Sequence, residues 1–302
     1  MTRRGLLLFA AMCVIWGIPY LFIRIAVHEI TPATLVFVRT GIAAIILLPI
    51  ALTRGGLRGI GRAWPWIVVF AAVEVGVPWL ALSSAEQQIS SALAGLLISA
   101  VPLVTLAIGI AIRNRQQIVG SNVAGLLIGL AGVALIVGFD LRASNAFALV
   151  EMAVVVIGYA LGPTIFARYL TGVPSFTVNG VALAMCCIAY APFGILQLPH
   201  TMPSISVIGA VLVLAVVCTA LAFLLYFELV KEAGPVRASV ITYVNPAVAA
   251  VLGVAVLQES LTAAMLVGFG LVLAGSALAT RRPPAAVATI APAQVRPSPK
   301  RT

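Results

Sequence analysis

Ten apolar segments divide the chain, and each is about as long as the ~20 residues that a helix needs to cross a bilayer. Only 9% of the 302 residues are charged and 62% are hydrophobic, whereas soluble domains carry roughly 25% charge. The runs of Leu, Val, Ile and Ala are unbroken, which excludes the alternating strands of a transmembrane β-barrel. The sequence therefore predicts an all-α integral membrane protein with ten transmembrane helices, at about residues 5–25, 33–53, 64–82, 89–112, 119–138, 146–167, 176–196, 205–229, 236–257 and 262–280.

The second half of the chain repeats the first at a nearly constant offset. Segments 89–112 and 236–257 both carry small residues on one face and a proline inside, and Pro102 and Pro246 are 144 residues apart. The same offset relates Pro19 to Pro163, Phe22 to Phe166 and Arg24 to Arg168, and an offset of 143 relates Gly125 and Gly132 to Gly268 and Gly275. We therefore expect two diverged repeats of five helices, 5–138 and 146–280. The glycines are expected to pack helices five and ten together.

The basic residues set the orientation of these helices. A cytoplasmic N-terminus places 15 of the 18 Lys and Arg residues in inner segments, with only Arg24 and Arg142 in outer loops and Arg39 inside a span. Inner loops are enriched in Lys and Arg, so both chain ends are expected in the cytoplasm, with a disordered basic tail at 281–302. Because five is odd, the second repeat enters the membrane from the opposite side. This predicts inverted repeats with a substrate site near the midplane between them.

Segment 225–275 closely resembles the EamA-type domain of the drug/metabolite transporter superfamily. The matching features are Pro246 in a helix of small residues, Glu259 before the next helix, and the Gly268 and Gly275 spacing. The first repeat matches through Trp16-Gly17, Pro32 with Arg39, residues 92–102, and Gly125 with Gly132. It departs at Arg113-Asn114-Arg115-Gln116, where the acidic residue is expected. The resemblance implies ten helices in two EamA units, and an exporter or permease of small metabolites in the inner (plasma) membrane.

Two ionisable side chains lie deep within the predicted spans. A charge near the bilayer centre costs roughly 2.5–3.5 kcal/mol on insertion scales, so each needs a reason. Arg39 lies about six residues, and Glu74 about nine residues, below the outer ends of helices two and three. We expect the two either to approach within ion-pair distance or to face a common wet cavity. In the functional interpretation Glu74 binds a proton or a cation and Arg39 tunes it, and in the structural one the pair fixes the two helices.

Other residues in the spans are candidates for a substrate or ion pathway. The aromatic candidates are Trp16, Tyr20, Trp79, Tyr159 and Tyr243, for which core packing is the alternative. The small and polar candidates are Ser91, Gly95, Ser99, Ser239, Thr242 and Asn245, for which close helix packing is the alternative. Candidate gate or hinge positions are Pro19, Pro102, Pro163 and Pro246, because a proline removes one helix hydrogen bond.

The sequence contains no P-loop, and no Ser-His, Asp-Asp or H-x-x-x-H arrangement lies inside a span. An intramembrane enzyme is therefore a weaker alternative. A scaffold without transport is weaker as well, because it would not need the charges of Arg39 and Glu74 inside the spans. No catalytic residue, metal, cofactor or nucleic-acid partner is predicted. We expect a secondary transporter, an exporter of small metabolites such as amino acids, that works by alternating access. A multidrug or organic-cation efflux permease is the alternative. Protons are a possible coupling ion, and the chain is expected to be a monomer or a homodimer.

Overall fold

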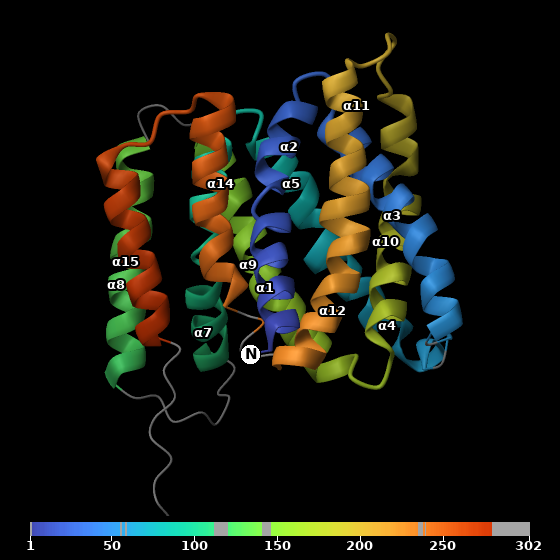
Figure 1. Ribbon diagram of the computed structural model, residues 1–302, viewed down its shortest axis with the longest axis horizontal. Helices are drawn as coiled ribbons and strands as arrows, with labels where there is room; N and C mark the ends of the chain where they lie inside the picture. Colours follow the sequence, from blue (N-terminus) through green and yellow to red (C-terminus); the bar gives the residue numbers. More distant parts are fainter. Residues whose placement is uncertain are drawn as a thin grey trace, which may run out of the picture.

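The computed structural model describes residues 2–54, 56–57, 59–111, 120–140, 146–234, 238 and 240–279. The described residues form ten helical units that run up and down the molecule (Figure 1). Units 1 to 5 are α1 (Arg3–Ile15) with α2 (Pro19–Ala26); α3 (Pro32–Arg54); α4 (Ile60–Phe70), the π-helix η1 (Ala71–Gly76) and α5 (Val77–Ala85); α6 (Ser91–Ile98) with α7 (Val101–Ala111); and α8 (Gly120–Asp140). Units 6 to 10 are α9 (Ala146–Tyr169); α10 (Ser175–Leu196); α11 (Ile205–Leu212), the π-helix η2 (Val213–Leu221) and α12 (Ala222–Ala233); α14 (Ile241–Leu257); and α15 (Ala263–Ala279).

The prediction of an all-helical membrane protein is confirmed. Eight of the described units are long and apolar enough to cross a membrane, and α14 and α15 are shorter apolar helices of 17 residues. The start of α1 and the end of α15 lie on the same side of the molecule, which we call the lower face (Figure 1). The loops around 27–31, 86–90 and 197–204 lie on the opposite, upper face. Ser239, the basic residues at 113, 115, 142 and 237, and the predicted tail at 281–302 lie outside the described residues.

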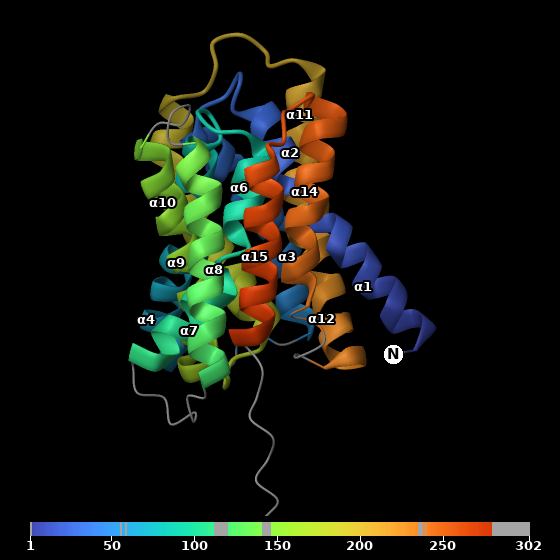
Figure 2. The same ribbon diagram turned by 90° about the vertical axis from the view of Figure 1, so that its left-hand side faces the viewer.

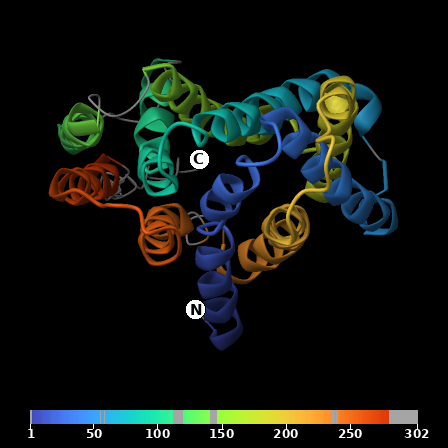
Figure 3. The same ribbon diagram turned by 90° about the horizontal axis from the view of Figure 1, so that it is seen from above.

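The units pack in a pattern that pairs the two halves of the chain. Unit 2 packs against unit 7, unit 4 against unit 9 and unit 5 against unit 10, while unit 3 packs against unit 6 and unit 1 against unit 8. Seen from above, α8 and α15 stand at one end of the molecule, and α3, α4 and α10 stand at the other (Figure 3). Each half therefore covers its apolar surface mainly with helices of the other half.

Helices α8 and α15 lie side by side (Figure 2). A methyl group added to Gly132 would lie 2.6 Å from the Gly268 carbonyl oxygen, and one added to Gly275 would lie 2.6 Å from the Gly125 carbonyl oxygen. The glycines therefore bring the two backbones into contact, as helix pairs in lipid do with small residues. This confirms the predicted packing of helices five and ten.

Side chains at the helix ends fix the loops of the upper face. The Glu29 carboxylate, between α2 and α3, accepts hydrogen bonds from the Ser204 hydroxyl (2.6 Å) and the Ser204 backbone N–H (2.7 Å) at the start of α11. These two hydrogen bonds, the hydroxyl one first, hold the pKa of Glu29 below its usual value. Thr34 at the start of α3 donates to the Gly194 carbonyl at the end of α10, 3.1 Å away. The upper ends of units 2, 7 and 8 are thus joined by polar contacts.

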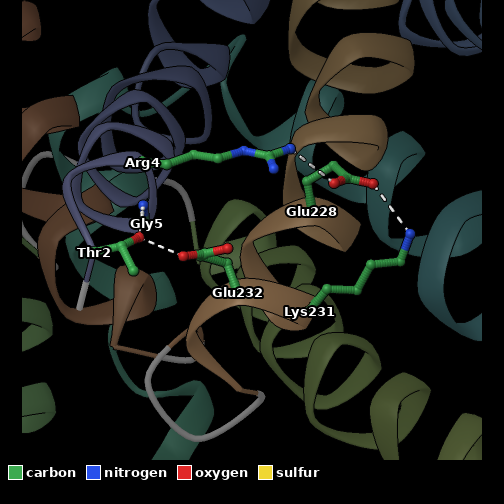
Figure 4. A network of polar contacts seen from close by, with 6 residues as sticks. All are labelled: Thr2, Arg4, Gly5, Glu228, Lys231 and Glu232. Atoms are coloured by element: carbon green, nitrogen blue, oxygen red, sulfur yellow. Dashed lines mark hydrogen bonds and ion pairs between the residues drawn. The ribbon is translucent and has the colours of Figure 1, made fainter.

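A polar network joins α1 to the end of α12 on the lower face (Figure 4). Arg4 and Lys231 both contact the Glu228 carboxylate at 3.1 Å, and the Thr2 hydroxyl donates to Glu232. The Thr2 hydroxyl also accepts from the Gly5 N–H, 3.0 Å away, and so caps α1. These exposed ion pairs hold the chain start against unit 8, and each stabilises the fold only weakly.

Glu259, the acidic residue of the family resemblance, caps a helix of the other repeat. Its carboxylate accepts hydrogen bonds from the Ser91 N–H (2.8 Å), the Ala92 N–H (2.9 Å) and the Ser91 hydroxyl (3.0 Å). The Ser90 hydroxyl accepts from the Leu93 N–H at 3.1 Å. Three of the four N–H groups that the first turn of α6 leaves without a helical partner are therefore satisfied by side chains.

Replacing Glu259 with glutamine removes the negative charge from the N-terminus of α6. We expect Glu259→Gln to lower the free energy of unfolding by about 1–2 kcal/mol, because both a cap and a charge at the positive end of a helix are lost. Denaturant titration in detergent micelles, followed by circular dichroism, measures the change. The matched control is Gln258→Asn, since Gln258 has a φ of 55° that asparagine also adopts. Equal stability of the wild type and Glu259→Gln would contradict the capping role.

Candidate functional site

Arg39 lies on α3 between three helical units and is only 6% exposed. Its Nε donates to the Thr219 hydroxyl of η2 at 3.0 Å, and its guanidinium carbon lies 3.7 Å from the centroid of the Trp79 ring on α5. The Thr219 hydroxyl in turn donates to the Leu214 carbonyl at 2.8 Å. A hydrogen bond and a cation–π contact, worth about 0.5–2 kcal/mol, therefore hold the guanidinium in one place.

The expected ion pair between Arg39 and Glu74 is wrong. Both ion pairs found in the described part of the chain contain Glu228, and Arg39 has no carboxylate within ion-pair distance there. The Glu74 carboxyl lies instead against Gly162 of α9, where a side chain larger than hydrogen would collide with it. One Glu74 oxygen is buried without a hydrogen-bond partner. The second expectation, that both residues face a wet cavity, stays a prediction.

The π-helix η1 explains the direction of Glu74. Pro78 has no N–H to donate to the Glu74 carbonyl, so the regular helix pattern cannot continue through this turn. Two side chains of α10 donate to carbonyls of the wide turn: the Tyr190 hydroxyl to Gly76 at 3.0 Å and the Cys186 thiol to Ala71 at 3.4 Å. Unit 7 therefore stabilises a turn that rotates the Glu74 side chain toward unit 6.

Aromatic side chains connect Arg39 to Glu74. Trp79 is 8% exposed and its indole lies within hydrogen-bonding reach of the Tyr159 hydroxyl on α9. Tyr159 interacts electrostatically with both Arg39 and Glu74, and the buried Tyr20 of α2 interacts with Arg39 and Tyr159. The structure thus brings four predicted site residues, Tyr20, Arg39, Trp79 and Tyr159, into one cluster, with Glu74 at its edge.

Trp16 extends this cluster toward unit 8. Its ring centroid lies 4.9 Å from that of Tyr226 on α12, and Tyr226 interacts electrostatically with Glu74. Trp16 ends α1, after which Gly17, Ile18 and Pro19 break unit 1. Unit 1 therefore changes direction beside the cluster.

The predicted small residues lie mostly where α6 packs against α14. Ser91 and Ser99 are buried, Ser91 donates to Glu259, and a methyl group at Gly95 would collide with Ala249 and touch the Tyr20 ring. On α14, the end of the Asn245 amide faces the Ile241 and Cys13 carbonyls at 3.1 Å, so the amide orientation that satisfies both carbonyls places the nitrogen there as donor. Thr242 and Tyr243 are half-buried on the same helix. These groups join units 1, 4 and 9, which agrees with the packing alternative, and a role in substrate contact stays a prediction.

The predicted hinge prolines fall into two classes. Pro19 and Pro102 follow breaks, between α1 and α2 and between α6 and α7, where a missing N–H is tolerated. Pro163 and Pro246 lie inside α9 and α14, which continue through them. The four repeat-related prolines therefore break only the helices of the first half.

One buried acid, Glu86, is not among the site residues predicted from the sequence. It directly follows α5, it is 0% exposed, and neither carboxyl oxygen has a hydrogen-bond partner among the described residues. The apolar pattern predicts that helix three ends at residue 82, which places residue 86 in the loop before the next helix. The helix in fact continues to Ala85, which draws the acid into the protein. Within the described ranges no three His, Cys, Asp or Glu side chains gather as metal ligands.

Comparisons with known proteins give the family of the chain. The model of the EamA-like transporter family matches residues 3–138 and 146–281. A transporter of Archaeoglobus fulgidus is 26% identical over 88% of this chain and 95% of its own length. The inner membrane transporter YedA of Escherichia coli strain K12 is 26% identical over 89% of this chain and 88% of its own length, and PecM of Dickeya dadantii is 25% identical over 86% of each.

The fold resembles that of a solved crystal structure. It superposes with a TM-score of 0.65 at 23% identity and covers 91% of this chain and 96% of its own. The family model covers both halves of the chain, and the relatives match along most of their length. The chain therefore belongs to the EamA-like transporter family and is a multi-pass membrane transporter rather than an enzyme.

Proposed function

We propose that this transporter carries small metabolites that bear a carboxylate, amino acids among them, across the inner membrane. The observation that carries the proposal is the buried Arg39 guanidinium without a carboxylate partner. Nε is the only Arg39 nitrogen with a hydrogen-bond acceptor in the described part of the protein, so the terminal nitrogens remain for a ligand. A carboxylate matches this planar pair of donors, and its charge offsets the cost of burying the cation.

The proposed mechanism is alternating access between two inverted repeats. The packing of units 2, 4 and 5 against their counterparts 7, 9 and 10 supports a two-fold relation of the halves. The π-helices support it too, because η1 shifted by 144 residues falls at 215–220, inside η2. In this proposal both chain ends are cytoplasmic, the upper face is the outer one, and Arg39 and its aromatic neighbours lie where the halves meet. Export is the direction that the family resemblance implies.

The second candidate substrate class is organic cations. The unpartnered carboxyl oxygens of Glu74 and Glu86 favour it, since a buried carboxylate attracts a cation. The single guanidinium in contact with Trp79 argues for the carboxylate class, because a cationic substrate would be repelled by Arg39.

Counterflow into proteoliposomes tests the proposal. The full chain is reconstituted, loaded with one unlabelled compound, and exposed to its radiolabelled form; the panel contains amino acids, dicarboxylates, neutral sugars and quaternary ammonium compounds. We expect saturable counterflow of compounds with a carboxylate and none above protein-free liposomes for sugars. Saturable flux of the ammonium compounds alone would instead establish the cation class.

A further inference from the structure

Glu86 is enclosed more completely than Arg39 or Glu74. Its side chain has no exposed surface and its two oxygens contact no hydrogen-bond donor in the described residues. A buried ionised carboxylate without partners is strongly disfavoured, whereas a neutral carboxylic acid costs far less. A proton neutralises the carboxylate and adds almost no volume to the site.

Arg24 contacts Glu86 but does not neutralise its carboxylate. Arg24 of α2 donates to the main-chain carbonyl of Glu86. The charged and titratable groups that interact with the carboxyl from the surrounding elements are Arg24 and Tyr20 on unit 1, Arg39 on α3, Tyr159 on α9 and Glu259 before α15. Burial raises the pKa of Glu86 well above its usual value, Glu259 raises it further, and Arg24 and Arg39 lower it by less.

Glu74 and Glu86 belong to the same helical unit, unit 3: Glu74 lies in η1, and Glu86 directly follows α5, 12 residues later. Tyr159 of α9 interacts electrostatically with both carboxyls. Tyr159 therefore links the two acids beside the Arg39 cluster.

We propose that Glu86 is a proton-binding site through which transport is coupled to the proton gradient, with Glu74 as the second carboxyl on the route. In the conformation described here Glu86 holds its proton. When the upper face opens, its O–H bond breaks, the proton passes to water, and the carboxylate pairs with Arg24; the reverse step reloads it. The inference adds a coupling ion and its site to the proposed function, on which it rests.

Infrared spectroscopy tests the protonation state without any substrate. The carboxylic acid C=O band of the purified protein in micelles is followed across neutral pH in the wild type, Glu86→Gln and Glu29→Gln. We expect Glu86→Gln to lose part of this band and Glu29→Gln to keep all of it, because Glu29 is exposed and ionised. An unchanged band in Glu86→Gln would show that Glu86 is already ionised and would overturn the proposal.

Transport tests the coupling. In proteoliposomes the ratio of substrate uptake with and without a pH gradient is compared between the wild type and the same variants. We expect Glu86→Gln to lose the stimulation by the gradient, and Glu29→Gln and Glu86→Asp, which keeps a titratable group, to retain it. Full stimulation in Glu86→Gln overturns the inference while leaving carboxylate transport intact. Absence of transport in every protein would contradict the proposed function, and the infrared result would still decide the protonation of Glu86.

Discussion

Replacing Arg39 with glutamine is expected to lower the rate of uptake of carboxylate substrates by about 10- to 100-fold. A hydrogen bond to a charged group contributes about 1.5–3 kcal/mol, and each 1.4 kcal/mol is a factor of ten in affinity. Arg39→Lys keeps the charge but loses the planar pair of donors and the face that lies over Trp79, so it is expected to recover only part of the rate. Initial rates in proteoliposomes measure both changes.

The fold is expected to survive this substitution. Removing one member of a buried ion pair leaves a stranded charge, but Arg39 has no carboxylate partner among the described residues. The matched control is Arg168→Gln, at the exposed end of α9, which should transport at the wild-type rate. A wild-type rate in Arg39→Gln, with the protein monodisperse on size exclusion, would refute the role of Arg39 in substrate binding.

Replacing Gly275 with alanine is expected to destabilise the folded protein. The added carbon would lie 2.6 Å from both the Gly125 carbonyl oxygen and the Gly129 Cα, so the backbones of α8 and α15 must separate. Overpacking of this kind costs typically 1–3 kcal/mol and occasionally more. Thermal unfolding in micelles, followed by circular dichroism, measures the loss.

Gly270 on the same helix provides the control. A methyl group there meets nothing within 4 Å, and alanine favours a helix over glycine by about 1 kcal/mol. Gly270→Ala should therefore be as stable as the wild type or more stable. Equal melting of both alanine variants would show that α8 and α15 are not in tight contact in the folded protein.

The sequence was sufficient to predict features that depend on the length of apolar segments and on the close approach of two helix backbones. The apolar runs predicted the helical units, and the glycines at 125, 132, 268 and 275 predicted the contact of α8 with α15. The relation between Arg39 and Glu74 was not predictable, because it depends on side-chain direction. Depth along a helix can be counted from the sequence, but the π turn at Ala71–Gly76 is held by Tyr190 and Cys186 of another unit.

Glu86 shows a second limit of the sequence. An acid near the end of an apolar run is ordinarily assigned to the loop, because a buried charge is costly. Whether such an acid is buried depends on neighbours from distant parts of the chain, and for Glu86 these include Arg24 and Arg39. The role of Glu259 as the cap of α6 was also not predictable, because its partners Ser91 and Ala92 are about 170 residues away in the sequence.

Helices of each half pack mainly against helices of the other half, and this has a consequence for how the chain folds in the membrane. A polypeptide ending after α8 would present to lipid the glycine stripe meant for α15, the face of α5 meant for α9, and the face of α1 meant for α12. We therefore expect that neither fragment of a chain cut between α8 and α9 folds fully until it binds the other. Folding of the molecule thus resembles the association of two subunits within a single chain. The helices of the first half are expected to complete their packing only after the second half has been inserted into the bilayer.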